Sequence, residues 1–158
     1  MVVLVYGGGG WVGSQLVPLL ADKARVELGE ARLENKEDVL KEVRKYHDPP
    51  RSEIVSIVNC AGIVGKPNVD WCESHRDETI TGNLVGPLNL VSCAKQFGIH
   101  VTHFSTGCIY NFDNNVIEPR EEDCPFPATG SFSETDPPNY TGSFYSKIKA
   151  LAENVSIS

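Results

Sequence analysis

Four consecutive glycines, directly after the first apolar segment, constrain the fold of this chain more than any other feature. Residues 2–6 read Val-Val-Leu-Val-Tyr, a run typical of a strand buried in a parallel sheet. Gly7, Gly10 and Gly13 follow at G-x-x-G-x-x-G spacing, and a helical pattern of apolar residues begins at once. The chain therefore opens with a strand, a glycine turn and a helix.

This order is the one that a dinucleotide-binding turn requires. The first glycine makes a tight turn, the second lets the backbone approach a pyrophosphate, and the third lets the helix pack against the strand. The pyrophosphate then binds at the free N–H groups and positive dipole end of the helix. We predict a cofactor site formed by Gly7, Gly10, Trp11, Val12 and Gly13, with a flexible glycine loop as the alternative.

Composition and net charge limit the classes of partner that this chain is expected to bind. The 158 residues are 41% hydrophobic and carry a net charge of −7, which fits one soluble α/β domain. The acidic balance argues against nucleic acid or an anionic membrane as the main partner, and no apolar stretch is long enough to span a membrane. Five cysteines without C-x-x-C spacing favour reduced thiols in a cytoplasmic protein, and we predict no metal site.

Apolar spacing and turn residues divide the rest of the chain into alternating strands and helices. Such alternation predicts an α/β fold with a doubly wound parallel sheet. Residues 111–141, rich in Pro, Asp, Asn and Ser, are predicted to form a long surface loop, and a further loop is predicted from Gly65 to Cys72. The predicted strands are 2–6, 25–28, 54–58 and 100–105, and the predicted helices are 11–21, 35–46, 77–97 and 143–154.

Tyr145 and Lys149 are four residues apart at the start of the last predicted helix, so they share one face. An ammonium near a phenol favours the phenolate and lowers the phenol pKa, so this pair is able to protonate a developing alkoxide. A surface tyrosine and lysine on an amphipathic helix is the alternative. Thr106 follows the predicted strand 100–105, at an edge where open α/β sheets bind ligands; an ordinary strand-end turn is its alternative.

Several motifs occur together in one order: the glycine turn, Asn59-Cys60-Ala61-Gly62, Asn83 in GNLVGPLNL, Ser105-Thr106 and Tyr145-x-x-x-Lys149. In this the chain resembles the extended short-chain dehydrogenase/reductase family, over essentially its whole length. GKPNVDWCESH, STGCIYN and NYTGSFYSKI make it similar to the nucleotide-rhamnose synthases, which are 3,5-epimerase/4-reductases, and to dTDP-4-dehydrorhamnose reductase. The resemblance implies a Rossmann-like fold, NADP(H) as cofactor and a sugar-nucleotide substrate.

The resemblance also implies residue roles. Thr106 polarises the 4-keto oxygen, Tyr145 supplies its proton, and Lys149 binds the nicotinamide ribose and lowers the Tyr145 pKa. Cys108, by similarity to GDP-fucose synthase, removes a proton during epimerisation; a buried small hydrophobe is the alternative. The remaining cofactor-binding positions are Arg32, which suits an adenosine 2′-phosphate, and Asn59, Ala61, Gly62 and Asn83.

One departure from the family concerns length, because the family continues beyond the Tyr/Lys helix into a lobe that binds the sugar nucleotide. We therefore expect residues 1–158 to be a C-terminally incomplete NAD(P)-binding domain that lacks this lobe and is inactive alone. Its strand 100–105 is then left as an open edge, which invites dimerisation. The alternative is a non-catalytic cofactor-binding or regulatory subunit, such as that of methionine adenosyltransferase, which resembles the same reductases.

Overall fold

A computed structural model describes residues 2–47, 54–111, 132 and 136–156. Strands and helices alternate along the chain, as the apolar spacing predicts. The four strands are β1 (Val2–Tyr6), β2 (Arg25–Gly29), β3 (Ile54–Asn59) and β4 (His100–His103). The helical segments are α1 (Trp11–Ala21), α2 (Lys36–His47), α3 (Trp71–Ser74), α4 (Arg76–Ile80), η1 (Thr81–Val85), α5 (Gly86–Lys95), η2 (Gly107–Ile109) and α6 (Phe144–Ser156).

All strand pairs in the described sheet are parallel, and the order is β2-β1-β3-β4. The chain leaves β1 toward one side for β2 and returns to the other side for β3. In open α/β sheets, ligands bind at the carboxyl ends of the strands where the order changes direction in this way. The point between β1 and β3 is therefore the expected crevice, and it contains the glycine turn after Tyr6.

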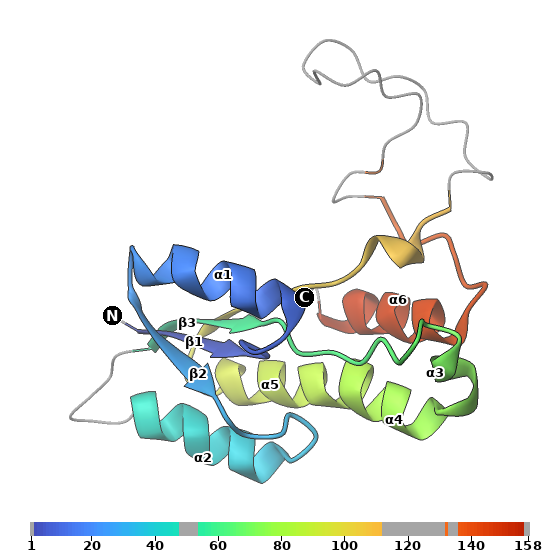
Figure 1. Cartoon of the computed structure of the whole chain (residues 1–158). Helices are drawn as coiled ribbons and strands as arrows, with labels where there is room; N and C mark the ends of the chain where they lie inside the picture. The colour runs from blue at the N-terminus through green and yellow to red at the C-terminus, as the bar shows by residue number, and fades with distance from the viewer. Residues whose placement is uncertain (1, 48–53, 112–131, 133–135, 157–158) are drawn as a thin grey trace.

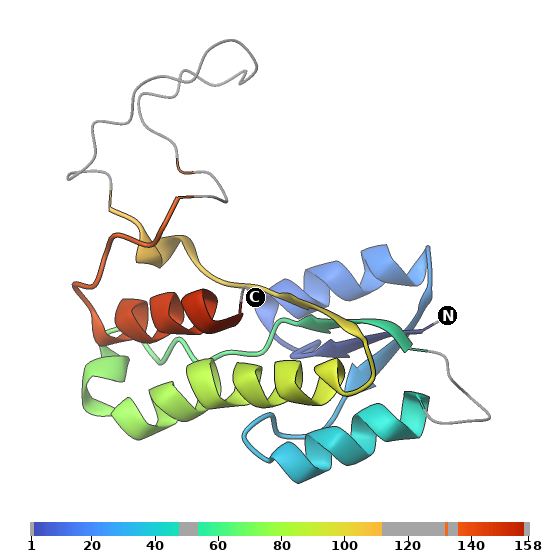
Figure 2. The same ribbon diagram turned by 180° about the vertical axis from the view of Figure 1, so that it is seen from behind.

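Helices cover both faces of the sheet, which confirms the doubly wound, Rossmann-like fold. Figure 1 shows α1 over one face and α2 and α5 over the other, and Figure 2 shows the same layers from behind. α6 lies beside the α4–α5 run, toward the carboxyl ends of the strands. The core between the sheet, α2 and α5 is apolar; it includes Leu4, Ile57, Val39, Val43 and Leu90, all fully buried.

The structure refines two predicted segments. The predicted loop from Gly65 to Cys72 ends in a short helix, α3. The predicted helix 77–97 is continuous but contains a π-helical turn, η1, that includes Asn83. Single π-helical turns inside α-helices often occur at functional sites. Residues 112–131 and 133–135, which make up most of the predicted loop 111–141, lie outside the described residues.

The predicted helix starts have local causes that the structure confirms. Asn35 precedes α2, and its Oδ1 accepts a hydrogen bond from the Asp38 N–H at 3.4 Å. Ser143 precedes α6, and its Oγ accepts from the Ser146 N–H at 3.0 Å. Gly98, with a φ of 64°, follows the helical run that α5 ends. These caps fix where α2, α5 and α6 begin or end.

The described residues also test the predictions about free thiols and membrane-spanning segments. Cys60, Cys72, Cys93 and Cys108 are free thiols, and Cys124 lies outside the described part. Within the described ranges, no helix combines the length and the apolar character that crossing a membrane requires. β4 is an edge strand of the described sheet, and Phe104, which follows it, is 41% exposed.

Candidate active site

The glycine turn has the close contacts that its spacing predicts. Gly7 has a φ of +74°, and a Cβ on it would lie 2.5 Å from the backbone nitrogen of Ala61. A Cβ on Gly13 would lie 2.3 Å from the carbonyl oxygen of Gly7, so α1 packs directly against the turn. The Gly10 N–H closes the turn by donating to the Gly7 oxygen at 3.0 Å. Gly7 and Gly13 are therefore required by backbone packing.

Gly10 differs, because the space around it is open. A Cβ there would meet only the Gly7 oxygen, at 3.3 Å. Gly10 is the cap residue of α1, and the first turn of that helix carries no acidic side chain. Trp11, the first helical residue, is 82% exposed. The start of α1 thus has the open backbone approach and the helix-dipole sign that an anionic pyrophosphate requires.

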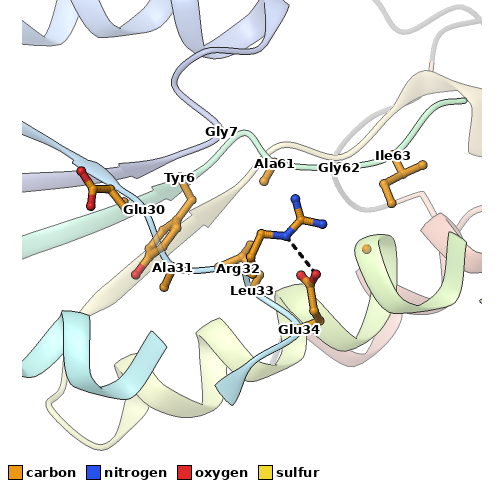
Figure 3. A pocket seen from close by; sticks show the side chains of 12 residues that line it. Tyr6, Gly7, Glu30, Ala31, Arg32, Leu33, Glu34, Ala61, Gly62 and Ile63 are labelled. Carbon is orange, nitrogen blue, oxygen red and sulfur yellow. Dashed lines mark hydrogen bonds and ion pairs between the residues drawn. The ribbon is translucent and has the colours of Figure 1, made fainter. Parts of the chain in front are cut away.

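A pocket of about 270 Å³ opens beside Gly7, at the predicted crevice between β1 and β3. Its walls are Tyr6, Gly7, the segment 29–34 after β2, the segment 61–63 after β3, and Gly82. Figure 3 shows Arg32 extended in this pocket, with its Nε 3.0 Å from Oε1 of Glu34. A second pocket of about 240 Å³ shares Arg32 and Glu34 and continues toward Asp77 and Glu78 of α4.

Arg32, predicted to bind an adenosine 2′-phosphate, is thus on the pocket wall but paired with a carboxylate. A backbone hydrogen bond and the nearby guanidinium keep the pKa of Glu34 below its usual range. The segment that carries Arg32 is fixed from α2, because the Glu42 carboxylate accepts from the N–H groups of Glu30 at 2.8 Å and Ala31 at 3.1 Å. The sequence gives no local signal for this contact.

The residues after β3 form the opposite wall. Ala61 and Gly62 line the pocket, as predicted. Asn59 and Asn83, predicted as cofactor ligands, are each 1% exposed and have internal partners. The Asn59 Oδ1 accepts from the Ala61 N–H at 2.9 Å, and the Asn83 amide bonds both the N–H and the oxygen of Ile63, at 2.9 and 2.7 Å. In this structure both asparagines fix the wall rather than face the pocket.

The predicted chemical groups come together between η2 and the start of α6. Tyr145 is 6% exposed, and its phenol lies near enough to the Thr106 hydroxyl for this hydroxyl to influence its pKa. The Thr106 Oγ1 also accepts from the Cys108 N–H at 3.2 Å. The Ser146 hydroxyl, which the sequence analysis missed, donates to the Cys108 oxygen at 2.7 Å. Three hydroxyl groups and a thiol, from segments about forty residues apart, thus share one site.

The Tyr145 pKa differs from the expectation. Burial raises the Tyr145 pKa above its usual value, the nearby Thr106 hydroxyl opposes this change, and the thiols of Cys108 and Cys72 raise the pKa further. The prediction that Lys149 lowers this pKa does not hold in the described geometry, because Lys149 Nζ is directed to the Phe104 oxygen at 3.3 Å. Tyr145 is therefore protonated at neutral pH, the state that a proton donor needs.

Lys149 is 4% exposed, so it is a buried amine rather than a surface lysine. Burial lowers its pKa, and the Glu153 carboxylate opposes this change. Cys108, in contrast, is exposed, which removes the alternative that it is a buried small hydrophobe. A thiol in the open, beside the Thr106–Tyr145 pair, is accessible to a substrate.

Two further residues hold the start of α6. The Glu73 carboxylate of α3 accepts from the Phe144 N–H at 2.6 Å, and the Arg76 guanidinium lies 4.8 Å from the Phe144 ring centroid. A carboxylate at a helix start also interacts favourably with the helix dipole. The WCES motif around Glu73 carries the resemblance, but its spacing to Phe144 gives no sign of this contact.

Known proteins resemble this chain over nearly its whole length. A family model described as "NAD dependent epimerase/dehydratase family" matches residues 3–153. The chain is 38% identical, over 155 residues, to the trifunctional UDP-glucose 4,6-dehydratase/UDP-4-keto-6-deoxy-D-glucose 3,5-epimerase/UDP-4-keto-L-rhamnose-reductase of Arabidopsis thaliana; the match covers 96% of this chain and 21% of that protein. It is 35% identical to the bifunctional dTDP-4-dehydrorhamnose 3,5-epimerase/dTDP-4-dehydrorhamnose reductase of the same plant, covering 96% of this chain and 46% of that protein.

A solved structure of a relative has the same fold as this chain. The L780 UDP-rhamnose synthase of Acanthamoeba polyphaga mimivirus superposes with a TM-score of 0.79 at 26% identity, over 98% of this chain and 51% of that one. The chain thus spans about half the length, or less, of the relatives named here. With a family model matched from the first strand to the last described helix, the chain belongs to the NAD dependent epimerase/dehydratase family.

Proposed function

We propose that this chain is the cofactor-binding domain of an NADPH-dependent epimerase/reductase. Its substrate is a 4-keto-6-deoxy sugar nucleotide, UDP- or dTDP-linked, in nucleotide-rhamnose biosynthesis. The named relatives carry epimerase and reductase activities of this kind, and the chain spans only part of each. The substrate-binding lobe belongs, in this proposal, to the part of such proteins that the chain does not span.

One observation carries the proposal: Thr106 and Tyr145, with Cys108 beside them, lie at the same edge of the sheet as the glycine turn, where the parallel strands β1, β3 and β4 end. The pyrophosphate binds at the start of α1, and the segments 29–34 and 61–63 hold the adenosine end. When bound, the dihydronicotinamide supplies the hydride. The reaction edge and the cofactor edge therefore coincide.

The chain's own residues supply the other steps. The Thr106 hydroxyl donates a hydrogen bond to the 4-keto oxygen and so orients the ketone. The Tyr145 phenol gives its proton to the alkoxide that forms there; its raised pKa keeps this proton in place until then. In the epimerisation steps the Cys108 thiolate takes a proton from the carbon next to the ketone and becomes a thiol, and the resulting enolate takes a proton from solvent water on its other face.

The preference for NADPH rests on Arg32. Its guanidinium is 81% exposed on the pocket wall, free to leave Glu34 for a 2′-phosphate. An exposed ion pair contributes about 0–1 kcal/mol, so a phosphate dianion competes easily with the single carboxylate. Arg32→Ala is expected to weaken NADPH binding about tenfold and to leave NADH binding unchanged, as isothermal titration calorimetry measures; equal losses for both cofactors would contradict this role.

The activity is tested with the complete protein that contains this chain, or with the chain supplemented by the missing lobe. NADPH oxidation is followed with UDP- and dTDP-4-keto-6-deoxyglucose, and the product is identified by mass spectrometry and NMR. Formation of the nucleotide-rhamnose supports the proposal. NADPH binding without turnover on either substrate would refute it in favour of a non-catalytic cofactor-binding subunit.

A further inference from the structure

Three polar side chains form a hydrogen-bonded row near the candidate site: Asn59 of β3, His103 of β4 and Lys149 of α6. Asn59 Nδ2 lies 3.0 Å from His103 Nδ1, and Lys149 Nζ lies 3.4 Å from His103 Nε2. Asn59 and Lys149 are almost completely buried, at 1% and 4% exposure, so their hydrogen bonds must be made internally or to a ligand. His103 is the link between the cofactor wall and the lysine.

The hydrogen positions in this row of side chains can be assigned by starting from Asn59. The Asn59 Oδ1 accepts from the Ala61 N–H at 2.9 Å, so the amide nitrogen faces His103. An amide NH₂ only donates, and therefore His103 Nδ1 accepts. A neutral imidazole carries one proton, and it then lies on Nε2.

The His103 Nε2–H consequently faces Lys149 Nζ. An uncharged amine has a lone pair that accepts this hydrogen, whereas an ammonium has none, so the charged form places one donor against another. The Phe104 oxygen, 3.3 Å from Nζ, is an acceptor for one N–H of either form. Uncharged Lys149 therefore accepts the His103 Nε2–H and completes the row of hydrogen bonds, whereas the Lys149 ammonium is repelled by that N–H.

We propose that His103 is a positioning residue, with its proton on Nε2, that determines where Lys149 points. Uncharged Lys149 stays against β4, bonded to His103 and Phe104. Charged Lys149 turns away from His103 and directs its N–H groups outward, to acceptors on the ligand side of the strand. The second half rests on the proposed function, in which those acceptors are hydroxyls of the nicotinamide ribose.

The ionisable groups around these three side chains agree with this arrangement. Burial is the larger cause that lowers the pKa of His103 to about 4, and repulsion between a charged ring and a charged Lys149 is the smaller one, so the ring is neutral at pH 7. Burial also lowers the pKa of Lys149, and Glu153, one turn further along α6, opposes it. The other titratable groups at this end of α6 are Tyr145 with the thiols of Cys72 and Cys108 beside it, and Glu73, which is bonded to the Phe144 N–H.

The tautomer is tested directly on the unmodified chain, without any cofactor. Two-dimensional NMR of the ¹⁵N-labelled imidazoles distinguishes a protonated Nε2 from a protonated Nδ1. We expect His103 to carry its proton on Nε2 at pH 7 and to remain neutral down to about pH 5, given its pKa of about 4. A proton on Nδ1, or a doubly protonated ring at pH 7, would overturn the proposal.

The link to Lys149 is tested with His103→Asn. The shorter amide can still accept from Asn59, but it places no N–H beside Nζ, so the ammonium is no longer opposed. The Lys149 titration midpoint, measured from its ¹³Cε shift, is expected to rise by about 0.5 pH units or more. An unchanged midpoint would overturn the proposal.

His100→Asn is the matched control. His100 lies on the same strand and is exposed, so this variant is expected to leave the Lys149 midpoint unchanged. An equal rise in both variants would also contradict the role of His103. If the protein binds no NADPH in calorimetry, the proposed function is refuted but the role of His103 is not. The His103 tautomer and the Lys149 titration midpoint are both measured without cofactor, so they test His103 independently.

Discussion

Gly13→Ala tests whether the third glycine of the turn is required by packing. Gly13 is buried in α1, where a new Cβ would lie 2.3 Å from the Gly7 oxygen and 2.7 Å from the Gly8 Cα. Both are backbone atoms, which cannot rotate away as a side chain does. To restore an ordinary contact of 3.4 Å, α1 must move from the turn by about 1.1 Å.

The expected cost follows from two opposing effects. Overpacking of a well-packed interior costs about 1–3 kcal/mol, and rigid backbone on both sides favours the upper end. Alanine in place of glycine inside a helix gains about 1 kcal/mol. The net loss in the free energy of unfolding is therefore about 2 kcal/mol. The displaced helix start should also bind NADPH about tenfold or more weakly, since about 1.4 kcal/mol is a factor of ten.

Urea denaturation measures the stability, and calorimetry with NADPH measures the affinity. Gly9→Ala is the matched control, because a Cβ there meets nothing within 4 Å, and it should change neither quantity. Gly10→Val tests the pyrophosphate approach: the branched side chain should abolish NADPH binding, and it should cost less stability than Gly13→Ala because its nearest backbone contact is 3.3 Å rather than 2.3 Å. A Gly13→Ala chain as stable as the parent would refute the packing argument.

Two further predictions concern the chemical groups and apply to a protein in which this chain is joined to the substrate-binding lobe of the proposed function. Tyr145→Phe keeps the buried ring but removes the proton donor, so reductase turnover should fall roughly 10²–10⁴-fold with little change in NADPH affinity; an unaltered turnover number would exclude Tyr145 as the donor. Cys108→Ser should slow solvent deuterium incorporation at carbons 3 and 5 more than it slows reduction, because only proton removal from carbon needs a thiolate. Normal exchange in the serine variant would remove Cys108 from the mechanism.

The parts of the fold with local causes could be predicted from the sequence. Gly7 must adopt a positive φ, Asn35 and Ser143 cap helices, and alternating strands and helices require parallel crossovers. The neighbouring positions of β1 and β3, and with them the crevice, follow the same rules. The resemblance predicted that Thr106 and Tyr145 share one site, and in the structure they lie near each other between η2 and the start of α6.

The parts that the sequence could not predict depend on distant contacts. The π-helical turn has no apolar signature of its own. Asn83 in it was predicted to bind the cofactor from the resemblance alone, and its bonds to Ile63, twenty residues away, have no signal in the sequence. The Tyr145 pKa was expected to fall because Lys149 is one helical turn away, yet burial is the larger effect. Periodicity gives the face on which a side chain lies, but not its partners from other elements.

The bond from Glu73 to the Phe144 N–H has a consequence for the order in which the site is assembled. The pocket walls come from residues 6–82, and Asn89 of α5 holds the segment after β2 by a bond to the Leu33 oxygen. Tyr145 takes its place only after α6 has met Glu73, which lies 71 residues before Phe144. Contacts over such separations close slowly. On a ribosome, every residue of the cofactor pocket is therefore synthesised before the proton donor.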